Sequence, residues 1–306
     1  MTTDQGCQEK NQLNCESFCH PGYVAVENPV IKTTSCSLPI TEITDEIKTE
    51  FLLAGRNGDI SVLNEILDDF SITYLKSVTM DSEKLNVLHL SARYGTLQVT
   101  KYLIELGCDM FDDSNQIFST KTRRNAFLLS AESGKTDQMK YFIGQKPEIL
   151  KTVDSRNNNA LHISAARGTL EGTEFLVKKY GLDIFDNSNI RGRNAFLTSA
   201  GAMNKTDQMR FFIKQNPEIL LSTDKYKHNA LHLSAKYGDI EGTKFLVEEQ
   251  GRDILDSSNG LGRNAFLLTA EGGAYKGQNK IIQMDYRVIL QKMSLNWPEM
   301  IQNELF

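Results

Sequence analysis

Two short strings of residues alternate along most of this 306-residue chain. The first string, Asn-x-Leu-His-(Leu/Ile)-Ser-Ala, begins at Asn86, Asn159 and Asn229. The second string, Arg-Asn-Ala-Phe-Leu, begins at Arg124, Arg193 and Arg263. Copies of one string lie 69 to 73 residues apart and the two strings interleave, so the underlying unit has about 35 residues. Self-similarity at such a period is typical of proteins that stack one small structural unit many times.

Each unit has the pattern of a helix, a turn and a second helix. Asn159 is suited to cap a short helix over 160–167, because its side chain can accept a hydrogen bond from a free backbone N–H. We expect Gly168 to end this helix in a left-handed conformation, and a second helix over 170–180 to end at Gly181. Two such short helices cannot bury their apolar faces alone, whereas stacked neighbours can. The pattern therefore predicts an all-α solenoid.

Seven units of this kind fit between residues 44 and 297. Asn204 stands where the corresponding unit has Gly134, and Asn is the residue other than Gly that best tolerates a left-handed backbone. The predicted units are 44–85, 86–123, 124–158, 159–192, 193–228, 229–262 and 263–297. Residues 1–43 have little periodicity and are predicted to be a disordered tail, and residues 298–306 form a second, C-terminal tail.

The units resemble ankyrin repeats, whose signature is Thr-Pro-Leu-His-x-Ala-Ala-x-x-Gly in a unit of about 33 residues. One matching segment is Asn159-Ala-Leu-His-Ile-Ser-Ala-Ala-Arg-Gly168, and those that begin at Asn86 and Asn229 match in the same way. The resemblance covers about 250 residues and implies an ankyrin-repeat α-solenoid. In every second unit Leu stands in place of the signature His, at Leu128, Leu197 and Leu267.

Two glycines depart from the family pattern inside the second helix. Gly172 and Gly242 fall where the family places a large aliphatic residue, and a glycine inside a helix costs about 1 kcal/mol relative to Ala. Met139 and Met209 lie one position further on in the second helix of the neighbouring units. We hypothesise that bulk from one type of unit fills the gap in the other, which would explain a sequence that repeats every two units.

The resemblance also implies a function, because ankyrin-like arrays bind other proteins and have no chemistry of their own. Contact is expected through the concave face, which comprises the finger-like turns between units and the residues just before the middle of each unit. The residues of this chain at those middle positions are Arg93, Tyr94, Glu132, Arg167, Lys236, Tyr237 and Glu271. Tyr and Arg are over-represented among binding hot spots, so these positions are candidate partner-binding residues.

One turn is longer than the others by four residues, and the extra residues fall within 116–124. It contains an apolar pair next to two cations, namely Ile117, Phe118, Lys121 and Arg123. Such a surface turn suits an acidic, hydrophobic peptide. A tolerated loop insertion is the alternative interpretation.

Other classes of function find little support. The net charge of −5 argues against a general nucleic-acid binder, which needs clustered positive charge. The recurring His89, His162 and His232 are explained by the repeat motif, and no catalytic constellation and no cofactor motif is present.

The N-terminal thiols and imidazole could form a zinc set, but their spacing fits no paired-ligand pattern, and free thiols are the simpler interpretation. The residues concerned are Cys15, Cys19, His20 and Cys36.

The sequence as given predicts a monomeric protein of the cytosol or nucleus. No apolar run approaches the roughly 18–20 residues that span a bilayer, and the first residues lack the pattern of a secretory signal. We therefore expect a cytosolic adaptor or scaffold that binds a protein partner of unknown identity. The alternative is the regulatory ankyrin domain of a larger protein, such as a channel, an enzyme or a ubiquitin-ligase adaptor.

Overall fold

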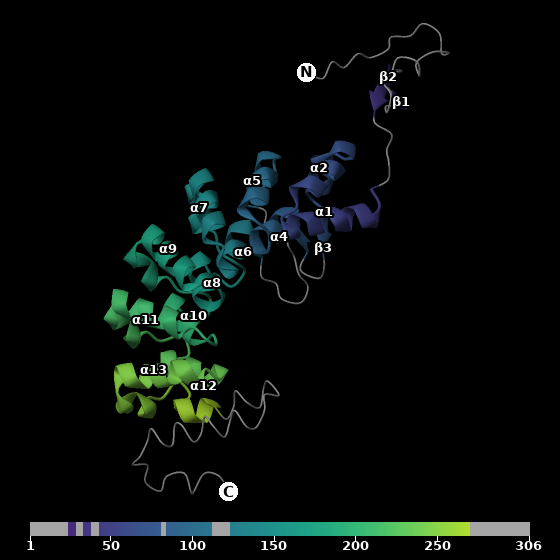
Figure 1. Cartoon of the computed structure of the whole chain (residues 1–306). Helices are drawn as coiled ribbons and strands as arrows, with labels where there is room; N and C mark the ends of the chain where they lie inside the picture. The colour runs from purple at the N-terminus through teal and green to yellow at the C-terminus, as the bar shows by residue number, and fades with distance from the viewer. Residues whose placement is uncertain (1–23, 29–32, 38–42, 81–83, 112–122, 270–306) are drawn as a thin grey trace, which may run out of the picture. The chain divides into compact units, whose positions relative to one another are not determined.

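The computed structural model describes residues 24–28, 33–37, 43–80, 84–111 and 123–269. The chain divides into two units, residues 1–48 and 49–306, with the division inside the first helix. Figure 1 shows the elements along the chain.

The first unit contains a pair of antiparallel strands, β1 (Val24–Asn28) and β2 (Thr33–Ser37). Val24 lies opposite Ser37, and Asn28 lies opposite Thr33. Both strands lie within residues 1–43, which the sequence predicts to be a disordered tail. β-Branched Val and Thr residues favour extended backbone, and both strands contain them.

The second unit is a stack of helix pairs, of which six lie in the described part of the chain. The first helices of the pairs, here called the inner row, are α1 (Asp45–Asn57), α4 (Val87–Arg93), α6 (Ala126–Glu132), α8 (Ala160–Arg167), α10 (Ala195–Ala200) and α12 (Ala230–Tyr237). The second helices, here called the outer row, are α2 (Ile60–Asp69), α5 (Leu97–Glu105), α7 (Thr136–Gln145), α9 (Leu170–Tyr180), α11 (Thr206–Gln215) and α13 (Ile240–Gln250). From α4 onwards each helix packs on its partner and on the next helix of its own row, as an α-solenoid requires.

Short elements connect the pairs. A four-residue helix and a small antiparallel ladder follow α2, and a 3₁₀ turn follows each outer helix from α7 onwards. These elements are α3 (Ile72–Leu75), β3 (Thr79–Met80), β4 (Leu85–Asn86), η2 (Pro147–Lys151), η3 (Leu182–Asp186), η4 (Pro217–Leu221) and η5 (Arg252–Asp256). The helices of the described residues are all too short or too polar to cross a bilayer.

An asparagine begins every inner-row helix from α4 to α12. Its side-chain oxygen accepts a hydrogen bond from the backbone N–H three residues on, at 2.8 to 3.0 Å. The bond satisfies one of the four N–H groups that a helix start leaves free. The capping residues are Asn86, Asn125, Asn159, Asn194 and Asn229. The cap predicted at Asn159 is thus confirmed.

The turn between the two helices of a unit uses glycine for two different reasons. Gly134 has φ +67° and Asn204 has φ +59°, so the left-handed conformation expected at these two positions is confirmed. The same expectation is wrong for Gly168, whose φ is −74°. A Cβ on Gly168 would lie 2.5 Å from the carbonyl oxygen of Ala131 in the preceding unit. Glycine is needed there because two backbones approach closely, not because the turn is left-handed.

Two of the signature histidines connect their own unit to the next. Nε2 of His162 lies 3.0 Å from the carbonyl oxygen of Arg193, and Nε2 of His232 lies 3.1 Å from that of Arg263. Burial is the main cause that lowers the pKa of both imidazoles, which favours the neutral ring that donates from Nε2. Leu197 is fully buried at the corresponding place of its own unit, so that unit gains apolar packing instead of this bond.

The methionines of the outer row occupy the space above the unusual glycines. A Cβ on Gly172 would lie 3.1 Å from the Cε atom of Met139, and one on Gly242 would lie 2.8 Å from that of Met209. Both methionines are fully buried. This is the contact that the complementary-volume hypothesis predicts.

Enlarging Gly172 should therefore be less costly once Met139 is truncated. We expect Gly172→Leu to lower the free energy of unfolding by about 1–3 kcal/mol through overpacking, and Met139→Ala to lower it by about 2–5 kcal/mol through a cavity. The double variant should lose clearly less than the two losses added together, as measured by urea unfolding. Gly144→Leu on α7 is the control, because nothing lies within 4 Å of its added Cβ. Additive losses would contradict the hypothesis.

Candidate functional site

Four turns project between consecutive units on the side of the inner row, and we call them the four fingers. They comprise residues 154–158, 189–193, 224–228 and 259–263. In each finger the first side chain, an Asp or an Asn, accepts hydrogen bonds from the backbone N–H groups two and four residues on. These first residues are Asp154, Asn189, Asp224 and Asn259. The four fingers therefore share one backbone conformation, whatever their other side chains are.

Backbone hydrogen bonds also join each finger to the next. The N–H of Ile190 donates to the carbonyl of Arg156 at 3.0 Å, and the N–H of Lys225 donates to the carbonyl of Arg191 at 3.0 Å. The N–H of Gly260 donates to the carbonyl of Tyr226 at 2.8 Å in the same register. The fingers thus form one continuous row with a fixed spacing.

The exposed charges of this row are all positive. Both of its carboxylates, Asp154 and Asp224, have side chains with no exposed surface, because they accept bonds inside their own turns. The exposed cations of the four fingers are Arg156, Arg191, Lys225 and Lys227. Exposed apolar side chains lie among them, at Ile190, Tyr226 and Leu261.

A cluster of ions fills the middle of the inner row, around the buried carboxylate of Glu132 at the end of α6. One of its oxygens lies 2.9 Å from a nitrogen of Arg124 and 3.9 Å from one of Arg93, and the other oxygen contacts Arg167. Arg124 also reaches Asp154 at 3.3 Å. Burial by itself would raise the pKa of Glu132, but the arginines outweigh it and the pKa is lowered. We call this group the Glu132 cluster.

The next pair of units keeps only part of this arrangement. Arg193 lies 3.1 Å from Asp224, as Arg124 lies beside Asp154, but Gly201 stands in the place of Glu132. The ring of Tyr237 lies 3.4 Å from where a Cβ on Gly201 would be, with the guanidinium of Arg193 5.8 Å from the ring centre. Burial would raise the pKa of the Tyr237 hydroxyl, but the positive charges of Arg193, Arg191 and Lys236 lower it.

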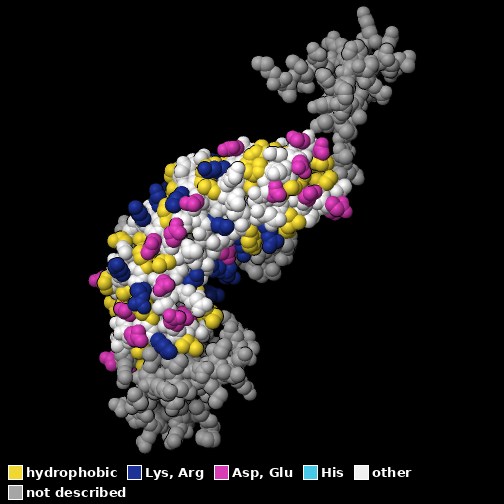
Figure 2. Space-filling view, viewed as in Figure 1, with side chains coloured by type: hydrophobic (Ala, Val, Ile, Leu, Met, Phe, Trp, Pro, Cys, Tyr) yellow, Lys and Arg dark blue, Asp and Glu magenta, His cyan; other side chains and the backbone are white. Residues whose placement is uncertain are grey.

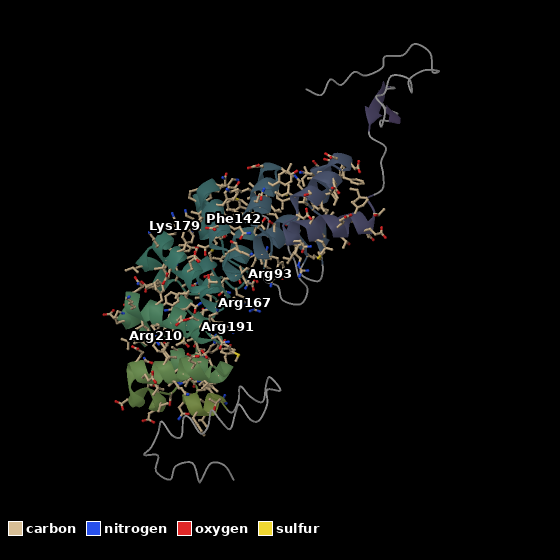
Figure 3. All side chains as sticks on the ribbon, viewed as in Figure 1. Arg93, Phe142, Arg167, Lys179, Arg191 and Arg210 are labelled. Atoms are coloured by element: carbon tan, nitrogen blue, oxygen red, sulfur yellow. The ribbon has the colours of Figure 1, made fainter. Side chains whose placement is uncertain are left out.

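Several of the residues predicted from the sequence to bind a partner lie at the inner row, and they differ in how exposed their side chains are. Tyr94 is 45% exposed and the side chain of Arg167 is 58% exposed, whereas the side chain of Glu132 is only 8% exposed. Glu132 was expected on the surface, but it is buried because neighbouring units supply its three arginines. Arg93, Lys236 and Tyr237 are partly buried, and Arg123 is exposed. Figure 3 labels Arg93 and Arg167 on the inner row, Arg191 in the finger row, and Lys179 and Arg210 on the outer row.

Some predictions fall outside the described residues. These are the contacts of the long turn and of the last unit, at Ile117, Phe118, Lys121 and Glu271, together with Cys15, Cys19 and His20 of the proposed zinc set. Cys36 lies in β2. Among the residues that the structure does describe, no three His, Cys, Asp or Glu side chains come together as metal ligands would.

Comparison with known families adds an independent observation. Residues 88–188 match the family model described as ankyrin repeats in three copies. Over these residues the chain is similar to three ankyrin repeats. The stacked helix pairs on either side of the matched residues have the same architecture as those within it, so the described fold is an ankyrin-type solenoid. The finger row and the Glu132 cluster both extend over consecutive units of this ankyrin array.

Sequence reasoning missed two features of the ankyrin array. It did not pair Arg124 with Asp154, although Arg193 and Asp224 repeat the same two positions one period later. It also named individual residues only in the longest turn, although the other turns taken together expose cations and apolar residues as well. In both cases the repetition of residue types in register was the available signal.

The Glu132 cluster gives the ankyrin array a pH-dependent contribution to stability. We expect Glu132→Gln to lower the free energy of unfolding by about 3 kcal/mol near pH 7, because it removes a buried carboxylate that three arginines share, of which Arg124 is itself buried. The lowered pKa of Glu132 means that the ionised form stabilises the fold above the unfolded-state pKa, about 4.3. The difference between wild type and variant should therefore shrink as the pH falls below about 4.

Chemical denaturation across this pH range measures the effect. Glu174→Gln is the matched control, because Glu174 is exposed on α9, and we expect it to change stability by less than about 0.5 kcal/mol. A loss for Glu132→Gln that does not vary with pH would show that the charge of this carboxylate does not stabilise the fold.

Proposed function

We propose that this protein is a non-catalytic protein-binding module, a cytosolic adaptor or scaffold, whose partner contacts the inner row and the four fingers. One observation carries the proposal: a single face presents exposed aromatic and cationic side chains on a framework held by hydrogen bonds between units. Tyr94 and Arg167 stand on this face, and the finger row borders it. Figure 2 shows Lys and Arg side chains on the inner edge of the stack and also on its outer edge.

The physical basis is the combination of hot-spot residue types and a rigid support. The guanidinium of Arg56 lies 4.9 Å from the centre of the Tyr94 ring, and that of Arg93 lies 5.3 Å from it, so cations restrict the ring before any partner arrives. A side chain that is already ordered loses less conformational entropy on binding. Tyr94 is therefore the side chain of the inner row best placed to anchor a partner.

Truncation of exposed and partly exposed side chains at the inner row tests the proposal in the full chain. The variant carries Tyr94→Ala, Arg167→Ala and Lys236→Ala, because truncation avoids placing a new negative charge beside Glu132. The control carries Glu174→Ala, Lys178→Ala and Lys244→Ala on the outer row, where all three residues are exposed. A partner captured by wild type should bind the control with the same affinity as wild type. It should bind the inner-row variant at least about tenfold more weakly, as measured by interferometry.

Circular dichroism melting curves of both variants control for folding. Equal affinity of the two triple variants for the captured partner would move the interface off the inner row and contradict the proposal.

A further inference from the structure

The residue at the tip of each finger follows a pattern along the array. We define the tip residue as the one two positions after the Asp or Asn that begins the finger, and its backbone N–H is bonded to that side chain in all four cases. The tip residues are, in order, Arg156, Arg191, Tyr226 and Leu261. Because the four fingers share one conformation, these side chains leave the backbone at equivalent places. The row thus begins with two cations and ends with two apolar residues.

The apolar half of the row is well exposed. Tyr226 is 58% exposed and Leu261 is 72% exposed. Large apolar side chains held in solvent on a rigid turn gain free energy when a partner covers them. Lys225 and Lys227 flank Tyr226, so this half also keeps a positive rim.

The cationic half has no exposed carboxylate of its own finger beside it. The fingers that bear Arg156 and Arg191 contain one carboxylate between them, Asp154, and its side chain is fully buried and bonded to Arg124 and its own turn. The positive charges of the two arginines are therefore not neutralised by an exposed carboxylate of their own fingers, although the chain as a whole has a charge of −5. A partner group that complements them carries negative charge.

The row is ordered in advance of binding. Besides the backbone bonds from finger to finger, the ammonium of Lys225 donates to the carbonyl of Ile190 at 2.7 Å, and the side-chain amide of Asn157 donates to the carbonyl of Ser188 at 3.1 Å. Neighbouring helices pack about 8–10 Å apart, and an extended peptide advances about 3.3 Å per residue. Successive fingers would therefore contact peptide residues that are roughly three positions apart.

We propose that the tip residues bind an extended segment of a partner protein that is acidic at one end and apolar at the other. The acidic end lies on Arg156 and Arg191, and the apolar end lies on Tyr226 and Leu261. This inference rests on the proposed function and adds the chemistry of the partner to it. A nucleic acid fits less well, because its phosphates recur along its whole length and would leave the two apolar tips without a complement.

Synthetic peptides of about 12 residues test this order. The first probe is fluorescein-labelled Glu-Ser-Asp-Glu-Ser-Asp-Leu-Ser-Phe-Leu-Ser-Phe, and the second has the same composition with acidic and apolar residues alternating. A third replaces each acidic residue with Lys, and a fourth probe is a labelled single-stranded DNA of about 12 nucleotides. Fluorescence anisotropy with the full chain should show the first probe binding at least about fivefold more tightly than the second, and the other two not binding.

Two double variants separate the contribution of the cationic tips to peptide affinity from that of the apolar tips. Arg156→Gln with Arg191→Gln should weaken the first probe about tenfold and make its affinity less sensitive to salt between about 50 and 300 mM. Tyr226→Ser with Leu261→Ser should weaken it about fivefold and leave the salt sensitivity unchanged. Lys178→Gln with Lys244→Gln on the outer row is the control and should leave the affinity unchanged. Melting temperatures close to that of wild type confirm that all three variants fold.

Four results would overturn the inference: no binding of the first probe, equal affinity for the first and second probes, unchanged affinity of either finger variant, or tighter binding of the DNA. These failures are distinguishable from failure of the proposed function, because the inner-row variants are tested separately against a captured partner. A partner that depends on Tyr94, Arg167 and Lys236 but not on the finger tips would leave that function standing and this inference refuted.

Discussion

No helix pair of this array is large enough to bury its apolar surface alone, and the rest of the structure depends on the burial that neighbouring pairs provide. The ring of Phe185, in the 3₁₀ turn of one unit, packs edge-on against Phe212 in the outer helix of the next, with centres 5.5 Å apart. Phe127 and Phe142 make a similar contact within a single unit, at 6.5 Å. Stability in such a stack is approximately a sum of units and of interfaces between neighbours. A change at one interface is therefore felt mainly by the two units that share it.

Polar groups decide how the units are aligned. Buried hydrogen bonds join His162 to Arg193, and buried ion pairs join Arg124 to Asp154 and Arg193 to Asp224. Each of these contacts joins residues that are 30 or 31 positions apart, and each would leave a buried polar group without its partner if the units shifted. Because the two carboxylates of the fingers are buried in this way, the exposed charges of the fingers are all cations. The alignment of the units and the surface available to a partner have the same cause.

Much of the fold was predictable because it depends on neighbours in the sequence. The asparagine caps need only the backbone three residues ahead, and the left-handed turn at Asn204 needs only the conformational preference of that residue. Gly168 shows the limit of this reasoning. Its role depends on the carbonyl of Ala131, which lies in another unit, so the correct residue was identified for the wrong reason.

The candidate site was less predictable than the fold. The sequence pattern could not show that Arg167 is exposed while Glu132 is buried, because both residues lie near the end of the first helix of their units. By itself the sequence determined the period, the caps and the turn residues of this protein, since these follow from local backbone chemistry. Only the tertiary structure decided which charges are neutralised inside the stack and which face solvent. That outcome depends on contacts between units, such as that of Arg167 with Glu132 across 35 residues of chain, which exist only once the units are stacked.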